Sequence, residues 1–153
     1  MQESSAGAQP TVLEVRYDKF VFRIPSDLLY SPDDVWVRLE RSVATIGITD
    51  FRQQSTGDLT FATPRRSGDR VLPGESIATI ETMKTVFDVP SPVEGTIVAT
   101  NEDLASTPES INLSPYGDGW IVKVELADPH LTGLLTPDEY AKEVRRKAED
   151  EAR

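Results

Sequence analysis

Two short β-type segments, Ser76 to Glu81 and Val86 to Val89, flank four residues that would form the tip of a hairpin, Thr82 to Thr85. Strands joined by so short a connection pair antiparallel, and this run therefore constrains the fold strongly. The tip contains no glycine, so we expect a type I turn, which needs no positive φ. Lys84 belongs to this tip, and we expect its amine to be exposed on a rigid, protruding turn.

Further strands are indicated along the chain by alternating apolar and β-branched residues. With 11 prolines and 9 glycines, the composition favours many short elements joined by turns. Leu72 to Glu75 is typical of a type II turn, because proline presets φ at the second position and glycine accepts positive φ at the third. The expected strands are Thr11 to Ile24 (one or two strands covering a sheet edge), Val35 to Glu40, Val43 to Ile48, Asp58 to Ala62, Gly95 to Thr100 and Gly119 to Leu126.

Two short helices are expected between these strands. Asp50 is suited to cap a helix that ends at Gly57, because glycine accepts the left-handed conformation that follows a helix end. The second short helix is predicted from Thr107 to about Asn112.

A helix at the C-terminus has the most specific start signal. Thr136 to Glu139 form a capping box with proline at the first helical position. We expect Glu143 to pair with Lys147 one turn later. The residues predicted on its buried stripe are Tyr140, Val144 and Ala148.

The net charge limits the partners. A chain of 153 residues fits one ordinary domain, and its formal charge is −10, from 26 acidic and 16 basic residues. Such a chain repels nucleic acid and anionic membranes, so we expect protein partners with basic docking surfaces. The sequence shows neither a secretory-signal pattern near its start nor an apolar stretch that could span a bilayer, and we therefore expect a cytoplasmic location.

Residues that could catalyse a reaction are scarce. The chain has no cysteine, which excludes thiol nucleophiles, disulfides and cysteine-bound metals. His130 is the single histidine, and no triad pattern accompanies it, so we interpret it as a surface residue. The carboxylates lack the spacing of a calcium loop, and no metal site is predicted. Chemistry would have to come from a group attached to Lys84.

Three runs resemble the H protein of the glycine cleavage system, a lipoyl carrier: Val43 to Asp50, the run around Lys84, and Asn112 to Lys123. The resemblance extends over roughly residues 28 to 145. It implies a mainly β fold, namely a flattened antiparallel lipoyl/biotinyl-type β-sandwich (barrel-sandwich hybrid) with short helices and a C-terminal helix. It also implies lipoate bound covalently to Lys84.

The same resemblance implies the roles of the neighbouring residues. Glu81 would be read by the modifying enzyme, and Asp88 would remain as a carboxylate for a loaded arm. The implied cofactor-binding residues are Lys84 (lipoylation), Glu81, Thr82, Met83 and Asp88.

The resemblance also implies the organisation and partners of the chain. We expect an H-protein-like lipoyl-carrier domain at 11–135 and a C-terminal helix at 136–153 packed on the same domain. Independently of the resemblance, residues 1–10 lack apolar periodicity, which predicts a disordered leader. The protein would be a monomeric cofactor carrier of a multienzyme system and not an enzyme by itself. A lipoate ligase or lipoyl transferase would modify it, and the enzymes of the glycine cleavage system would use it.

Departures from the family pattern leave alternatives open. Asp34-Val35 stands where glycine-cleavage H proteins usually have His-Glu before a tryptophan, and Ala62-Thr63-Pro64 stands where they usually have Glu-Leu-Pro. The first departure removes a carboxylate that helps to hold an aminomethyl arm, and Asp34 lies one residue away, on the opposite face of a strand. An H-like lipoate-binding protein of heterodisulfide-reductase-like sulfur oxidation, serving the enzymes of that system, is therefore an alternative.

A biotinyl carrier domain is a further alternative, because Met83 precedes Lys84 as in biotin carriers, although Thr82 and Thr85 replace the other residues of that pattern. We interpret Trp36 and Trp120 as core aromatics, in preference to contacts of the arm.

Overall fold

The computed structural model describes residues 11–151, and the expected leader at 1–10 lies outside this part of the chain. The strands are β1 (Val12–Tyr17), β2 (Phe20–Pro25), β3 (Leu29–Tyr30), β4 (Val35–Glu40), β5 (Val43–Ile48), β6 (Leu59–Pro64), β7 (Arg70–Val71), β8 (Ser76–Thr82), β9 (Val86–Pro90), β10 (Gly95–Thr100) and β11 (Val122–Leu126). The helical segments are α2 (Asp50–Thr56), the 3-10 turn η1 (Glu102–Ala105), α3 (Ser110–Leu113) and α4 (Pro137–Glu151).

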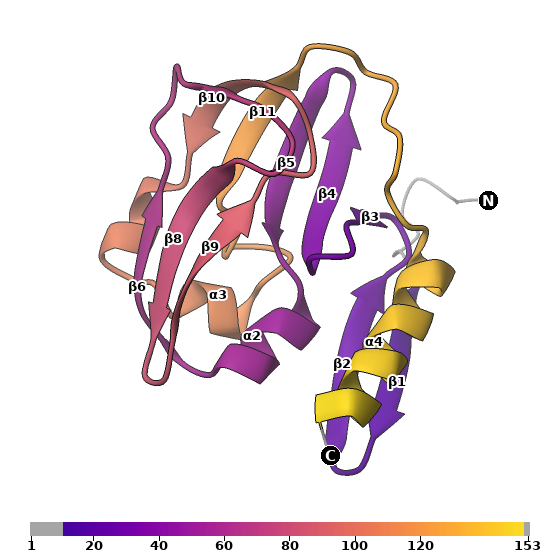
Figure 1. Cartoon of the computed structure of the whole chain (residues 1–153). Helices are drawn as coiled ribbons and strands as arrows, with labels where there is room; N and C mark the ends of the chain where they lie inside the picture. Colours follow the sequence, from indigo (N-terminus) through magenta and orange to yellow (C-terminus); the bar gives the residue numbers. More distant parts are fainter. Residues whose placement is uncertain (1–10, 152–153) are drawn as a thin grey trace, which may run out of the picture.

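Two antiparallel sheets enclose the main core. A six-stranded sheet has the order β3-β4-β5-β11-β10-β7, and a three-stranded sheet has the order β6-β8-β9. Buried aliphatic side chains from both sheets form one cluster, including Ile46, Ile80 and Val124. Figure 1 shows the tip of the β8–β9 hairpin at the same end of the molecule as α2 and α3. The expected mainly β, antiparallel sandwich is confirmed, and in the described residues its sheets do not close into a barrel.

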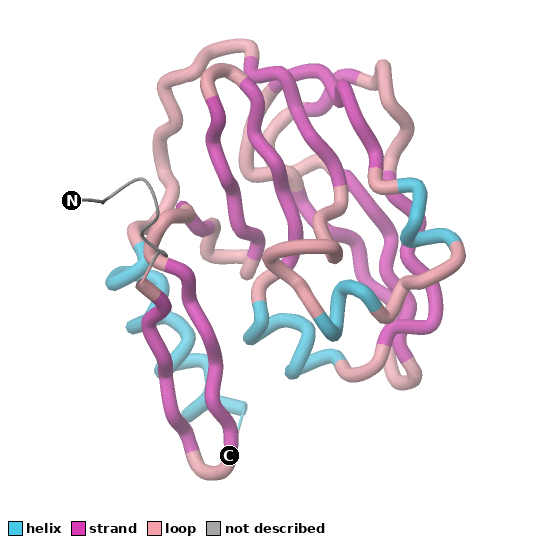
Figure 2. The backbone as a smooth tube through the Cα atoms, turned by 180° about the vertical axis from the view of Figure 1, so that it is seen from behind, coloured by secondary structure: helices cyan, strands magenta, loops and turns pink. Residues whose placement is uncertain are grey.

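The N-terminal strands form a separate layer with the C-terminal helix. β1 and β2 pair only with each other, so the expectation that this segment covers a sheet edge is wrong. Instead α4 packs on the β1–β2 hairpin, beside the sandwich (Figure 2). Tyr30 of β3 and Tyr140 of α4 stack with ring centroids 4.5 Å apart. These contacts create a second apolar cluster, in which Phe22, Trp36 and Phe51 are also buried.

The short helices differ from the predictions in their first residues. Thr49 caps α2, with its side chain accepting a hydrogen bond from Arg52 N, and Asp50 is the first helical residue. The Asp50 carboxylate instead accepts from Arg23 N at 2.9 Å, which ties α2 to β2. α3 starts at Ser110, because Thr107 first makes a turn in which Ser110 N donates to its carbonyl. The turn η1 was not predicted.

The last strand starts later than predicted. β11 begins at Val122, because Trp120 N donates to the carbonyl of Gly117 at 3.1 Å and so belongs to a turn. Gly119 packs closely on α3 in this turn: a Cβ there would lie 2.7 Å from the Cα of Ile111.

The capping box of α4 is confirmed. Thr136 N donates to Glu139 Oε1 at 2.9 Å, and Glu139 N donates to Thr136 Oγ1 at 3.2 Å. The predicted stripe of Tyr140, Val144 and Ala148 is buried. The predicted Glu143–Lys147 pair is wrong, because Lys147 reaches Asp34 on the sandwich and Glu143 binds Arg146. No helix of the described residues has the length and apolarity needed to cross a membrane.

Candidate modification site and adjacent pocket

The tip of the β8–β9 hairpin is fixed by the side chain of Thr82. Thr82 N donates to Thr85 O at 2.8 Å, and neither Met83 nor Lys84 has positive φ, so the tip needs no glycine. The Thr82 hydroxyl accepts hydrogen bonds from Lys84 N at 3.2 Å and Thr85 N at 3.1 Å. Met83 N also donates to Asp58 O, which ties the tip to the loop before β6. The backbone that carries Lys84 is therefore held by its neighbours.

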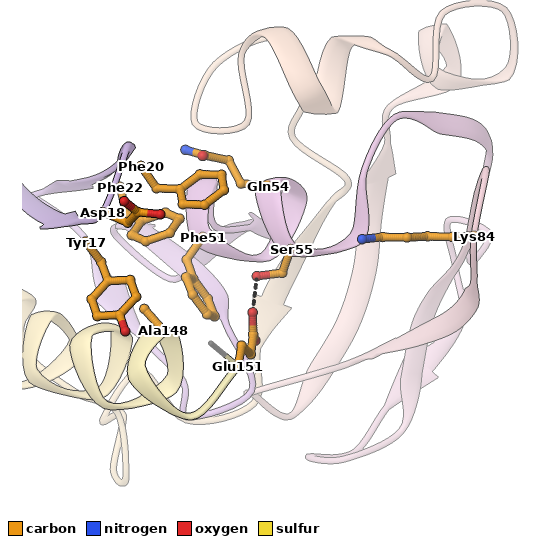
Figure 3. Close-up of a pocket in the computed structure, with 10 residues that line it drawn as sticks. All are labelled: Tyr17, Asp18, Phe20, Phe22, Phe51, Gln54, Ser55, Lys84, Ala148 and Glu151. Atoms are coloured by element: carbon orange, nitrogen blue, oxygen red, sulfur yellow. Dashed lines mark hydrogen bonds between the residues drawn. The ribbon is translucent and has the colours of Figure 1, made fainter. Parts of the chain in front are cut away.

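The side chain of Lys84 is exposed and forms no ion pair within residues 11–151. It extends from the tip toward the end of α2, since a Cβ on Gly57 would lie 3.7 Å from Lys84 Cε. Figure 3 shows its amine pointing toward Ser55 of α2. An amine in this position is accessible to an acylating enzyme.

Glu81 and Asp88 lie on the outer face of the three-stranded sheet. Phe61, Glu81 and Val86 are direct cross-strand neighbours on β6, β8 and β9, so their side chains share that face. Phe61 is 61% exposed and Val86 is 62% exposed, and they therefore place an accessible apolar group on each side of the Glu81 carboxylate. Asp88 lies one row farther from the tip, where it accepts a hydrogen bond from Thr79 Oγ1 at 2.8 Å.

The predicted site residues thus separate into two groups. Met83, which is 79% exposed, and Lys84 lie at the tip, while Thr82 is buried beneath it. Glu81 is next to the tip on the outer face, and Asp88 is on the same face but is not among the residues that line the pocket described next.

A pocket of about 440 Å³ opens beside Lys84, between the β1–β2 hairpin, α2 and α4. Its apolar walls are mainly aromatic: the rings of Phe20 and Phe22 stack with centroids 6.0 Å apart, and Phe51 meets Phe22 edge-on with centroids 5.0 Å apart. Ser55 Oγ donates to Glu151 Oε1 at 3.4 Å across one side of it (Figure 3). The lining residues are Tyr17, Asp18, Phe20, Phe22, Phe51, Gln54, Ser55, Lys84, Ala148 and Glu151.

Sequence reasoning missed this pocket. The alternation of Phe20, Phe22 and Ile24 indicates a strand, but it does not say what the exposed ring of Phe20 faces. The remaining walls come from α2 and from the far end of α4. The one feature of the sequence that could have indicated the pocket was an aromatic residue, Phe20, in a predicted strand.

Asp34 does not supply the carboxylate that is missing at Val35. It has positive φ of 67° and is buried, and its Oδ1 accepts hydrogen bonds from Tyr140 OH at 2.8 Å and Lys147 Nζ at 3.0 Å. Burial, followed by the charge of Asp34, raises the pKa of Tyr140 well above its usual value. Val35 is fully buried in the main core. Asp34 therefore anchors α4 and does not face the pocket.

Trp36 is a core residue, as expected. It is fully buried, and its Nε1 donates to Pro115 O at 2.9 Å. Trp120 is half-buried, with the ammonium of Lys123 5.3 Å from its ring. His130 is exposed on its loop beside Asp128, as expected for a surface histidine. The residues described form no cluster of three or more potential metal ligands from His, Cys, Asp and Glu.

Comparisons with known proteins agree on one family. The family model described as glycine cleavage H-protein matches residues 28–147. A probable glycine cleavage system H protein of Aeropyrum pernix is 42% identical over 144 residues, which cover 94% of this chain and 99% of that protein. The glycine cleavage system H protein of Listeria innocua is 46% identical over 120 residues, which cover 78% of this chain and 96% of that protein.

A solved structure gives the same result. The crystal structure of a glycine cleavage system H protein from Mycobacterium marinum matches with a TM-score of 0.73 and 34% identity, covering 78% of this chain and 97% of that one. The chain belongs to the glycine cleavage H-protein family.

Proposed function

We propose that this protein is a lipoyl carrier of the H-protein type, with lipoate attached through an amide to Nζ of Lys84. The observation that carries the proposal is an exposed lysine at the tip of a rigid hairpin in a member of this family. When bound, the dithiolane supplies reversible disulfide and dithiol chemistry that the cysteine-free chain lacks. The protein is a cofactor carrier and leaves catalysis to its partner enzymes.

The residues of the tip position the amine. Thr82 fixes the backbone of Lys84, so the acylating enzyme meets one conformation and does not have to order a loop. A covalent arm on this fixed base keeps its cargo at high effective concentration near each partner active site in turn. The enzymes of the glycine cleavage system are the proposed partners, and the monomer is the proposed form.

Glu81 is the proposed recognition residue for the lipoate ligase or lipoyl transferase. Its carboxylate lies between the exposed side chains of Phe61 and Val86, next to the tip. A complementary enzyme surface would present a basic group flanked by apolar ones. This arrangement also suits a chain with a formal charge of −10. Asp88, one row away, is proposed as a secondary contact on the same face.

The alternative roles have less support. The relatives described above are named as glycine cleavage H proteins, and they do not favour sulfur oxidation or biotin transfer. Two features favour the sulfur-oxidation alternative, namely the departure at Val35 and the additional segment from Thr11 to Ile24. In this fold the side chain of Val35 belongs to the main core.

We also propose that residues 11–135 and the C-terminal helix form one carrier unit. The hydrogen bond from Tyr140 to Thr49 and the ion pair from Lys147 to Asp34 support this, since they join α4 to the sandwich.

Co-expression with a lipoate ligase tests the proposal. The intact mass of the wild-type chain should increase by one lipoyl group, and Lys84→Arg should abolish the increase while keeping the fold. Lys19→Arg is the matched control, because Lys19 is an exposed lysine in the turn between β1 and β2. A lipoyl group that persists on Lys84→Arg would refute the assignment. Reaction of the purified wild type with streptavidin would show a biotin carrier instead.

A further inference from the structure

We propose that the surface around Leu113 of α3 is where the enzymes that act on the arm of Lys84 bind this carrier. The inference rests on the proposed function and adds to it the surface that those enzymes recognise. The partner is a protein surface with an apolar socket bordered by lysine or arginine side chains. The acylating enzyme, by contrast, is proposed to read the outer sheet face at Glu81.

Leu113 is an apolar side chain that a rigid segment holds in water. It is 82% exposed, the largest exposed fraction among the large hydrophobic side chains of residues 11–151. Its backbone is fixed, because Leu113 N donates to Glu109 O at 3.0 Å and the nearby Ile111 is fully buried. Single exposed leucines are common on protein surfaces, so the inference depends on where this one lies. A side chain on a fixed backbone loses little conformational entropy when a partner covers it.

Contacts of Asn112 place α3 beside the modification tip. Asn112 Nδ2 donates to Gly57 O at 3.1 Å, in the loop before β6. The next residue of that loop, Asp58, accepts a hydrogen bond from Met83 N of the tip at 3.2 Å. Figure 1 accordingly shows α3 and the tip of the β8–β9 hairpin at the same end of the molecule. An enzyme that binds α3 therefore has the arm of Lys84 next to its contact surface.

The charge around Leu113 is of one sign. Between Lys84 and Lys123 the chain has no lysine, arginine or histidine but six acidic residues: Asp88, Glu94, Glu102, Asp103, Glu109 and Asp118. The last four are exposed on η1, at the start of α3 and in the turn after it, and none of them forms an ion pair within residues 11–151. Glu109 lies one helical turn before Leu113. An apolar group within an acidic surface is complementary to an apolar socket with a basic border.

This surface differs from the one proposed for the acylating enzyme. Glu81 lies on the outer face of the three-stranded sheet, between Phe61 and Val86. α3 instead contacts the main core, because Ile111 is one of the core residues. The outer face and α3 are therefore different surfaces near the same tip. A substitution on one surface should not affect the enzyme that reads the other.

The test measures how well the lipoylated full-length protein serves the glycine-decarboxylating enzyme of the glycine cleavage system. Release of labelled carbon dioxide from carboxyl-labelled glycine is followed while the carrier concentration is varied, which gives KM for the carrier and kcat. Leu113→Ser removes the apolar group, and Leu113→Met keeps one. Leu72→Ser is the matched control, because Leu72 is an exposed leucine in the turn before β8, at the end of that strand opposite the tip.

We expect Leu113→Ser to raise KM for the carrier about tenfold, which corresponds to about 1.4 kcal/mol of binding free energy, with little change in kcat. Leu113→Met and Leu72→Ser should keep the wild-type KM. Tm should be unchanged in all three variants, because the replaced side chains are exposed. The rate of lipoylation of Leu113→Ser should equal that of wild type, whereas Glu81→Gln should lower this rate and keep KM for the decarboxylating enzyme.

The acidic surroundings are tested separately. Added salt should raise KM of the wild type, because screening weakens the attraction between the acidic surface and a basic socket border. Glu109→Gln should raise KM at low salt and reduce its dependence on salt. Glu40→Gln is the control, because Glu40 is exposed at the end of β4 farthest from the Val35–Ile48 pair that precedes α2. Equal salt dependence of Glu109→Gln and wild type would overturn the electrostatic part of the proposal.

A KM of Leu113→Ser equal to that of wild type would overturn the proposal, as would an equal increase for Leu72→Ser. Slower lipoylation of Leu113→Ser would assign the surface to the acylating enzyme instead. A wild-type dimer that Leu113→Ser abolishes in sedimentation equilibrium would assign it to a second copy. Intact mass before the assay separates these failures from failure of the function, because a chain that never gains a lipoyl group refutes the carrier role itself.

Discussion

Replacing Thr82 by valine keeps the shape of a side chain that is 8% exposed but removes the hydroxyl that holds the modification turn. In the wild type this oxygen accepts from Lys84 N at 3.2 Å and Thr85 N at 3.1 Å, and it donates to Thr85 O at 3.3 Å. Valine leaves both N–H groups to water at an exposed tip. The packing of Thr82 against the sheet is retained, so the effect of this change is confined to the hydrogen bonds.

The expected loss of unfolding free energy is about 1–2 kcal/mol, because each such bond contributes about 0.5–1.5 kcal/mol net and water replaces part of it. For a chain of this size that corresponds to about 2–8 °C in Tm. Thermal unfolding followed by circular dichroism measures this loss. Thr82→Ser keeps the hydroxyl and is the control for the side-chain change.

The same substitution should slow acylation. A turn without its internal acceptor samples several conformations, and the enzyme must then order it on binding, so KM for the carrier should rise with little change in kcat. Amide exchange at Lys84 and Thr85 should accelerate in parallel. If Thr82→Val matched both wild type and Thr82→Ser in Tm, exchange and KM, the hydroxyl would have no role in fixing the tip.

Three further predictions concern the core, the tyrosines and the outer sheet face. Gly47→Ala should destabilise the fold by about 1–3 kcal/mol, because a Cβ there would lie 2.8 Å from the buried indole of Trp36. Urea unfolding measures this loss of stability, and a urea midpoint equal to that of the wild type would contradict the prediction. Burial raises the pKa of Tyr140 and of Tyr116 well above the usual value of a phenol. Above about pH 10 the unfolded chain therefore loses tyrosine protons that the folded chain keeps, and stability should fall as pH rises through this range. Urea midpoints between pH 8 and pH 11 test this, and Tyr140→Phe should flatten the decline. Glu81→Gln should lower kcat/KM for acylation by about tenfold or more through loss of a charged contact, with unchanged Tm. Asp88→Asn on the same face should lower kcat/KM less, because Asp88 is proposed as a secondary contact. Equal rates for Glu81→Gln and wild type would show that Glu81 has no role in recognition.

The modification hairpin could be predicted from sequence because its determinants are local. The β-type segments Ser76 to Glu81 and Val86 to Val89 and the four residues between them specify the pairing. The cross-strand register of β8 and β9 places Glu81 beside the tip. The capping box at Thr136 is local in the same way, and both of its hydrogen bonds form. In such segments the residues that decide the conformation are a few positions apart.

The pocket and the anchoring of α4 could not be predicted because they depend on long-range contacts. Phe22 meets Phe51 across 29 positions of the chain, and Lys147 reaches Asp34 across 113. Spacing of i to i+4 on a helix favours an ion pair between Glu143 and Lys147. In the structure Lys147 instead forms its ion pair with the buried carboxylate of Asp34, which is the stronger hydrogen-bond partner. The aromatic residues of the β1–β2 hairpin indicated a strand, and only the packing of α4 on β1–β2 gives them a common cavity.

Tryptic mapping of the chain after co-expression with a lipoate ligase tests the central claim most directly. No lysine or arginine other than Lys84 lies between Arg70 and Lys123. Trypsin does not cleave after an acylated lysine, so a lipoyl group on Lys84 should yield one uncut peptide from Val71 to Lys123 with the added mass. Cleavage between Lys84 and Thr85 in the lipoylated protein, with the group found on another lysine, would contradict the account.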